Sequence, residues 1–155
     1  LKILLLVLLA SCLGFLFFNW PKASIFMGDA GSIFLGFCFS ALIIYSVTLK
    51  EISMLTWLVV FGYYLSDTSI TTLIRLCLVK KWYGTHRSHA YQNLARIKNN
   101  HFIVTVGVLF YHLIWLLPLA ILTVLKPNLG LIAVTLAYLP SIILTIKFGP
   151  LFSRE

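Results

Sequence analysis

Residues 31–49 read GSIFLGFCFSALIIYSVTL, an apolar run without a charged side chain. A helix needs about 20 residues to cross roughly 30 Å of hydrocarbon, so this run is long enough to span a membrane. The run is continuously apolar rather than alternating, which excludes the strands of an outer-membrane barrel. This stretch therefore predicts a transmembrane helix.

Four other segments extend the same pattern along the chain. Residues 3–18, 102–125 and 129–146 are apolar and free of charge, and residues 52–78 begin apolar but become polar at Ser66-Asp67-Thr68. Hydrophobic residues make up 61% of the chain and charged residues 10%, whereas charged residues form about a quarter of a soluble domain. We expect an all-α, polytopic membrane helix bundle of about five transmembrane helices, built as a single membrane domain over residues 1–155.

The basic residues gather on one side of this expected bundle. The net charge is +8, and with five crossings one side receives only Lys2, Lys50 and Lys126. The other side receives Lys22, Arg75, Lys80, Lys81, Arg87, Arg96, Lys98, Lys147 and Arg154. An excess of Lys and Arg marks cytoplasmic loops, which predicts a multi-pass protein of the inner (plasma) membrane. Topology and anionic headgroups explain the charge more simply than nucleic-acid binding does.

The junction FMGDAGS, residues 26–32, opens the second crossing from the predicted cytoplasmic side. Glycines let a backbone approach a ligand closely, and a helix N-terminus favours phosphate. An ionised Asp29 beside phosphate suggests Mg²⁺, which takes one or two carboxylates together with phosphate oxygens. From spacing alone, the simpler alternative is favoured: Asp29 is an ordinary N-cap, and the glycines serve the turn.

A basic loop, HRSHAYQ at residues 86–92, lies on the same predicted side. His86 and His89 share one face if the loop is helical, but a third zinc ligand at fitting spacing is absent. With Arg87 between them, donors to a pyrophosphate are the better interpretation, since guanidinium binds phosphate through two hydrogen bonds. Taken alone, the loop is slightly better explained as a solvated basic segment.

Asp67 lies about 22 Å along the third crossing at 1.5 Å per residue, in its cytoplasmic half. Acidic residues within membrane spans usually face a cavity or a partner. Two compatible interpretations follow. Asp67 has a functional role, or it is a buried carboxylate satisfied by Ser66, Thr68 or Arg75 nearby.

Two long motifs and their neighbours carry a family resemblance. The segment CLGFL at residues 12–16, together with Phe18-Asn19, Pro21, Ala23, FMGDAGS and the loop HRSHAYQNLAR, resembles the polyprenyl-phosphate N-acetylhexosamine-1-phosphate transferases of glycosyltransferase family 4. The resemblance covers nearly the whole chain as the C-terminal half of such an enzyme. The histidine loop is most similar to the branch that initiates O-antigen or capsule chains.

The resemblance implies Mg²⁺-dependent transfer of a sugar-1-phosphate from a UDP-sugar to polyprenyl (undecaprenyl) phosphate. The reaction would release UMP at the cytoplasmic face and initiate a cell-surface glycan, as in lipopolysaccharide or cell-wall biogenesis. By the same resemblance Asp29 binds the metal, the Phe26 ring stacks on uracil and Asn19 belongs to the nucleotide pocket. Asp29, His86 and His89 are the expected catalytic residues, and Asn19, Phe26, Asp67 and Arg87 the expected substrate-binding residues.

One departure from the family is an absence. The paired aspartates that the family places in its N-terminal half have no counterpart here, so we expect only part of a site, inactive alone. The expected partners are that missing N-terminal half, the two substrates, the membrane and a second copy in a homodimer, but no nucleic acid.

A transporter or channel subunit is the alternative, with Asp29 and Asp67 as ion-pathway carboxylates. The sequence shows neither the broken helices nor the internal repeats typical of that class.

Overall fold

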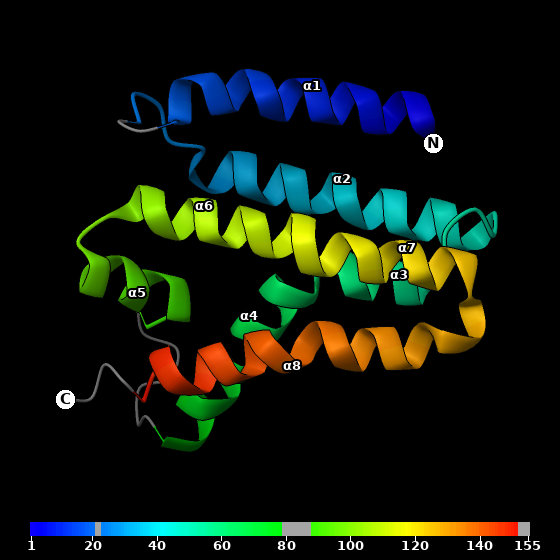
Figure 1. Cartoon of the computed structure of the whole chain (residues 1–155). Coiled ribbons are helices and arrows are strands. Elements are labelled where there is room, and N and C mark those ends of the chain that lie inside the picture. Colours follow the sequence, from blue (N-terminus) through cyan, green and yellow to red (C-terminus); the bar gives the residue numbers. More distant parts are fainter. Residues whose placement is uncertain (21–22, 79–87, 152–155) are drawn as a thin grey trace. The chain divides into compact units, whose positions relative to one another are not determined.

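The computed structural model describes residues 1–20, 23–78 and 88–151. Every regular element in those ranges is a helix, so the all-α class is confirmed (Figure 1). The chain divides into two compact units, Leu1–Ser53 and Met54–Glu155, and each is described here by itself.

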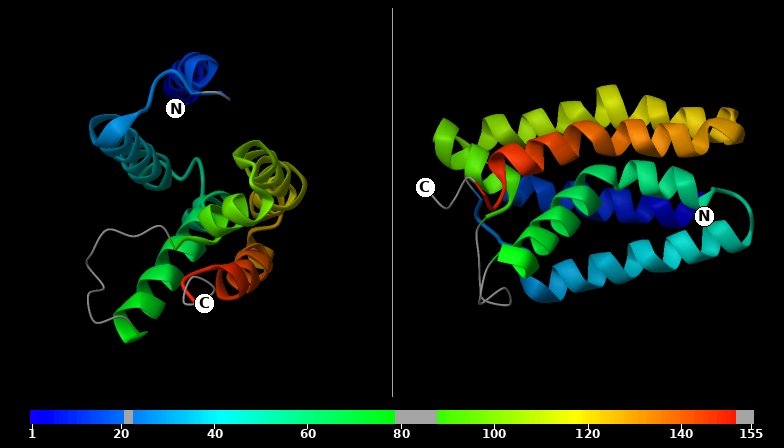
Figure 2. Two further views of the ribbon diagram at one scale, coloured as in Figure 1. Left: turned by 90° about the vertical axis from the view of Figure 1, so that its left-hand side faces the viewer. Right: turned by 90° about the horizontal axis from the view of Figure 1, so that it is seen from below.

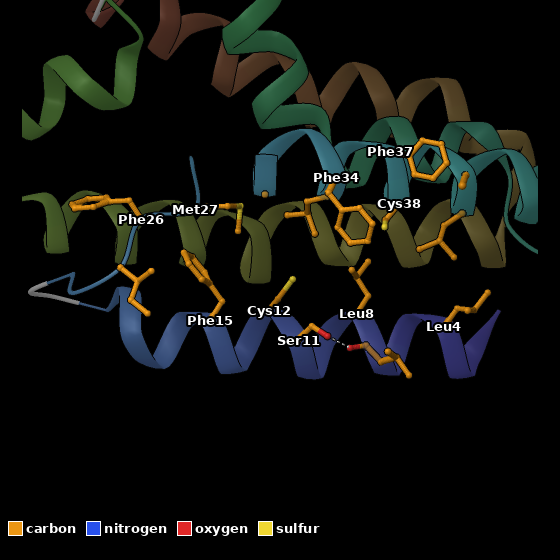
Figure 3. A pocket seen from close by; sticks show the side chains of 16 residues that line it. Leu4, Leu8, Ser11, Cys12, Phe15, Phe26, Met27, Phe34, Phe37 and Cys38 are labelled. Atoms are coloured by element: carbon orange, nitrogen blue, oxygen red, sulfur yellow. Dashed lines mark hydrogen bonds between the residues drawn. The ribbon is translucent and has the colours of Figure 1, made fainter. Parts of the chain in front are cut away.

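The first unit contains α1 (Lys2–Asn19) and α2 (Gly28–Thr48). A cavity of about 760 Å³ lies between these helices, and Figure 3 shows its apolar lining. Phe15, near the end of α1, and Gly31, near the start of α2, line it together, as do Leu4 and Leu42 at the opposite ends of the helices. The two helices are therefore antiparallel. Neither carries a charged residue except at its ends.

The described part of the second unit contains three longer helical segments and a short helix. The bounds are α3 (Met54–Val60), α4 (Gly62–Leu78), α5 (Ala90–Lys98), α6 (His101–Tyr111), the π-helical turn η1 (His112–Leu116), α7 (Leu117–Leu125), the 3₁₀ turn η2 (Pro127–Leu129) and α8 (Gly130–Phe148). The longer segments are each made of successive elements, α3 with α4, α6 with η1 and α7, and η2 with α8, and the short helix is α5. The segment from α6 to α7 forms one long rod that returns through η2 into α8 (Figure 1). Figure 2 shows α8 lying beside both this rod and α4.

Four helices are long and apolar enough to cross a membrane: Lys2–Asn19, Gly28–Thr48, His101–Leu125 and Pro127–Phe148. They coincide with four of the five predicted crossings, which confirms a multi-pass membrane protein. The fifth predicted crossing, residues 52–78, is divided at Phe61 into α3 and α4, so it stays a prediction.

The interruption of residues 52–78 was not predicted, because one glycine in an apolar run is a weak breaking signal. Hydrogen bonds still connect the two halves: Phe61 N–H donates to the Trp57 carbonyl (3.0 Å), and Leu65 N–H donates to that of Phe61 (2.9 Å). Gly62 meets the ring of Tyr138 on α8, whose Cε2 would lie 3.3 Å from an added Cβ. A small residue therefore lets α8 approach where the helix direction changes.

Small and hydroxylated residues connect the helices of the second unit. Ala133 and Ala137 of α8 are fully buried in the core beside Val59, Tyr63, Leu116 and Ala120. Two hydroxyl pairs cross between helices: Thr56 with Thr123 (2.8 Å) and Ser66 with Ser141 (2.7 Å). Small residues and interhelical hydrogen bonds are the means by which helices associate in lipid, where burial from water contributes little.

Candidate functional site

The loop between α1 and α2 is closed by side chains at its two ends. The Asn19 amide donates to the Ile25 carbonyl (2.8 Å). Ser24 donates to the Phe18 carbonyl through both its backbone N–H (3.0 Å) and its hydroxyl (2.9 Å). Asn19, expected in a nucleotide pocket, thus has an observed role: its amide group fixes the loop that presents Phe26.

Phe26 and Asp29 are exposed where this loop enters α2. Phe26 is 80% exposed, and its side chain also lines the apolar cavity between α1 and α2 (Figure 3). Gly28 adopts φ +63°, a left-handed conformation that costs little only for glycine. This turn starts the helix at Gly28, two residues after Phe26, and brings Asp29 into its first turn.

The N-cap interpretation of Asp29 is wrong. The N-cap of α2 is Met27, which makes no side-chain cap hydrogen bond, and Asp29 lies within the first helical turn. Among the described residues, no hydrogen bond or ion pair engages the Asp29 carboxylate. A negative charge there complements the positive end of the helix dipole. The carboxylate is therefore available to a cation or to a polar ligand.

Whether these residues fit Mg²⁺ depends on the donor set. Within the described ranges, no three His, Cys, Asp or Glu side chains gather as a metal cluster. A protein-only cage is thus absent from that part of the chain. One exposed carboxylate nevertheless fits Mg²⁺, which usually keeps several waters and binds through one or two carboxylates plus substrate phosphates.

The second unit holds a buried polar cluster around Asp67, which is 4% exposed. Its Oδ2 accepts a hydrogen bond from Nδ1 of His89 (2.8 Å). Its Oδ1 accepts from the backbone N–H of Ala90 (3.2 Å) and from the hydroxyl of Thr145 on α8 (3.1 Å). The carboxylate is buried, as one of the two interpretations predicted. Its partners differ from the expected Ser66, Thr68 and Arg75, and the Ser66 hydroxyl instead pairs with that of Ser141.

Asp67 thereby caps a helix to which it does not belong. His89 is the N-cap residue of α5 and Ala90 its first residue, so two of the three groups bonded to Asp67 lie at the start of that helix. A carboxylate at a helix N-terminus satisfies free N–H groups and complements the helix dipole. The basic loop is therefore helical from Ala90, and its entry is docked onto α4 and α8.

The body of α5 is attached to the end of α8 by a residue that the sequence reasoning missed. The Asn93 side-chain amide donates to the backbone carbonyls of Phe148 (2.7 Å) and Gly149 (3.1 Å), and the Arg96 guanidinium donates to the side-chain oxygen Oδ1 of Asn93 (3.2 Å). The sequence signal that could have indicated Asn93 is its spacing: it lies four residues, about one helical turn, after His89 and so on the same helix face. His89 N–H also donates to Gln92 Oε1 (3.3 Å). His89 is thus held from several directions.

Two expected residues, His86 and Arg87, lie outside the described residues, so their part in a pyrophosphate site stays a prediction. His89 retains 20% exposure of its side chain, and its ring stacks on Tyr91 with centroids 5.9 Å apart. Asp29 belongs to the first unit and His89 to the second. Their meeting on a common ligand therefore also stays a prediction.

Comparison with known proteins connects these features to a family. Residues 1–47, which contain Asn19, Phe26 and Asp29, match the model of glycosyl transferase family 4. A similar protein is the probable undecaprenyl-phosphate N-acetylglucosaminyl 1-phosphate transferase of Bacillus subtilis, 36% identical over 100 residues. Over the matched residues, the chain is similar to glycosyl transferase family 4.

A second similar protein is the phospho-N-acetylmuramoyl-pentapeptide-transferase of Chlamydia muridarum, 62% identical over 34 residues. The aligned regions cover 62% of this chain and 27% of the Bacillus protein, and 22% of this chain and 10% of the Chlamydia protein. The chain thus spans only about a quarter of the first relative's length. No solved structure matches it.

Proposed function

We propose that the complete protein transfers a sugar-1-phosphate, an N-acetylhexosamine-1-phosphate, from a UDP-sugar to polyprenyl phosphate. The reaction takes place at the cytoplasmic membrane face, releases UMP and initiates a cell-surface glycan. The observation that carries this proposal is the exposed Asp29 in the first turn of α2, inside the segment that matches the family. The names of both relatives describe transfer of a phosphosugar, one of them to undecaprenyl phosphate.

Phosphoryl transfer needs mainly positioning and neutralisation of charge. Asp29 would supply the protein ligand to Mg²⁺, which when bound offsets the negative charge of the diphosphate. Phe26 would place the nucleotide by stacking on its base, and Asn19 keeps the loop that carries Phe26 in shape. His89, joined by His86 and Arg87, would donate hydrogen bonds to the diphosphate.

The charge of the second unit supports the cytoplasmic assignment. Arg96 and Lys98 in the last turn of α5 and Lys147 in the last turn of α8 lie at the end of this unit where Asn93 joins the two helices. Lys126 lies at the opposite end, beside η2. An excess of positive residues identifies the cytoplasmic end, which is then the end that carries His89.

The test is Asp29→Asn in the complete protein. We expect UMP release and incorporation of labelled UDP-sugar into a lipid extract to fall by at least about a thousandfold, with the protein still folded, because the metal-dependent charge neutralisation is lost. Ser32→Ala, one turn along the same exposed face, is the matched control and should keep near-normal turnover. Near-normal turnover of Asp29→Asn would contradict the proposed role.

One observation favours the alternative of a transporter: the interruption between α3 and α4, followed by a buried carboxylate at Asp67. Broken helices near ionisable residues are typical of transporters. The same labelled assay separates the two, since a transporter leaves no sugar in the lipid extract. The bonds of both Asp67 oxygens to protein groups favour the transferase.

A further inference from the structure

Asp67 joins three helices at one point. It lies on α4, and its two oxygens accept hydrogen bonds from the start of α5 and from Thr145 of α8. Burying a carboxylate in a helix bundle is unfavourable, and apolar packing of similar volume is often equally stable. A carboxylate at this position therefore calls for a reason beyond holding helices together.

The hydrogen bond to His89 has a definite chemical consequence. An ionised carboxylate only accepts hydrogen bonds, so Nδ1 of His89 must carry the proton that lies between them. Nε2 is then the ring nitrogen through which His89 can act on a ligand. With the Nδ1 proton directed at Asp67, His89 donates to phosphate through Nε2–H only when both ring nitrogens are protonated, and the negative charge of Asp67 compensates that form.

Thr145 fixes the carboxylate in turn. Its hydroxyl shares its proton between Asp67 Oδ1 (3.1 Å) and the Ser141 carbonyl (2.9 Å), and Thr145 is 1% exposed. With Ala90 N–H on the same oxygen, Oδ1 is held from α5 and α8. Oδ2 is thereby oriented toward His89. The chain Thr145–Asp67–His89 orients an imidazole in the way that second-layer carboxylates orient catalytic histidines.

We propose that Asp67 is a positioning residue, which fixes the tautomer and orientation of His89 so that Nε2 meets the diphosphate, and that Thr145 of α8 orients Asp67. This inference rests on the proposed transferase function. It replaces direct substrate contact by Asp67, and it makes α8 part of the active site although α8 carries none of the family's motifs.

The experiment compares Asp67→Asn with Ser141→Ala in the complete protein. Asn keeps the shape and can still accept from Ala90 N–H, but it lacks the negative charge, and its amide group presents N–H to Nδ1. His89 then carries a proton on Nε2 only and loses the positive charge that faces the diphosphate. We expect kcat to fall by about a hundredfold or more, within the range that positioned proton-bearing groups contribute, with KM for the UDP-sugar changed less than about threefold. Ser141→Ala removes the neighbouring α4–α8 bond to Ser66 and should leave kcat within about threefold.

Nitrogen-15 NMR of the histidine rings supplies a readout independent of activity. We expect His89 to carry a proton on Nδ1 in the wild type and to switch toward the Nε2–H tautomer in Asp67→Asn. If Asp67→Asn does not fold, Thr145→Val carries the test, with about a tenfold loss of kcat and an unchanged KM.

The proposal is overturned if Asp67→Asn keeps both kcat and the tautomer, or if Ser141→Ala loses as much kcat as Asp67→Asn. In the latter case Asp67 serves only the packing of α4 on α8. A wild type that transfers no sugar, together with a tautomer switch in Asp67→Asn, would refute the transferase function while supporting control of His89 by Asp67.

Discussion

The start of α2 and the junction of α4, α5 and α8 are both polar sites in an apolar protein, yet they are built in opposite ways. At α2, Asp29 and Phe26 are exposed, and no described hydrogen bond or ion pair engages the Asp29 carboxylate. At the junction, Asp67 is buried, and both of its oxygens have protein partners. The difference separates groups available to a ligand from groups that position other groups.

Removing the carboxylate at each place should give the largest difference in stability between the two sites. Asp67→Ala leaves the partly buried His89 Nδ1–H and the buried Ala90 N–H without their acceptor, which we expect to lower the free energy of unfolding by about 3–5 kcal/mol. Asp29→Ala removes an exposed group and should change it by less than about 0.5 kcal/mol. Thermal unfolding of both variants in the same detergent measures the difference. Equal losses would mean that exposure does not distinguish the two sites.

The four apolar crossings were predictable because the hydropathy of each segment follows from its own consecutive residues. The predicted runs 3–18 and 31–49 correspond to the helices Lys2–Asn19 and Gly28–Thr48, with boundaries that differ by up to three residues. Residues 26–32 also predicted a carboxylate at the start of this crossing, and Asp29 lies exposed in the first turn of α2, while its role in a site stays a prediction. The N-cap role of Asp29 was wrong, because the turn at Gly28 starts the helix before Asp29.

The junction was not predictable in the same way. Asp67 and His89 are 22 residues apart, and Asp67 and Thr145 are 78 apart. Their pairing depends on how α8 packs along α4, which no local pattern encodes. The sequence therefore suggested neighbours such as Ser66 and Thr68 as partners. Asn93 was missed for the same reason, since its acceptors are carbonyls at the far end of the chain.

Phe26 tests whether an exposed group at the start of α2 contributes to ligand binding rather than to stability. Phe26→Ala should weaken binding of UDP by roughly 5- to 150-fold, because stacking of a base on an aromatic ring contributes about 1–3 kcal/mol. Since the ring is 80% exposed, the unfolding free energy should stay within about 0.5 kcal/mol of the wild type. Isothermal titration of UDP measures the affinity, with Phe26→Tyr as the matched control that keeps a ring. An unchanged affinity of Phe26→Ala would remove Phe26 from the nucleotide site.

The smallest expected effect compares one hydroxyl from each place. Ser141→Ala deletes the partner of the buried Ser66 hydroxyl (2.7 Å), which should cost about 1 kcal/mol of stability. Ser32 donates to the Asp29 carbonyl (3.1 Å) in an exposed helical turn, where water can replace it, so Ser32→Ala should cost only a few tenths of a kcal/mol. Paired unfolding curves resolve this difference. A larger loss for Ser32→Ala would mean that the start of α2 is a structural junction as well, because an exposed hydroxyl can matter that much only if it holds the turn itself.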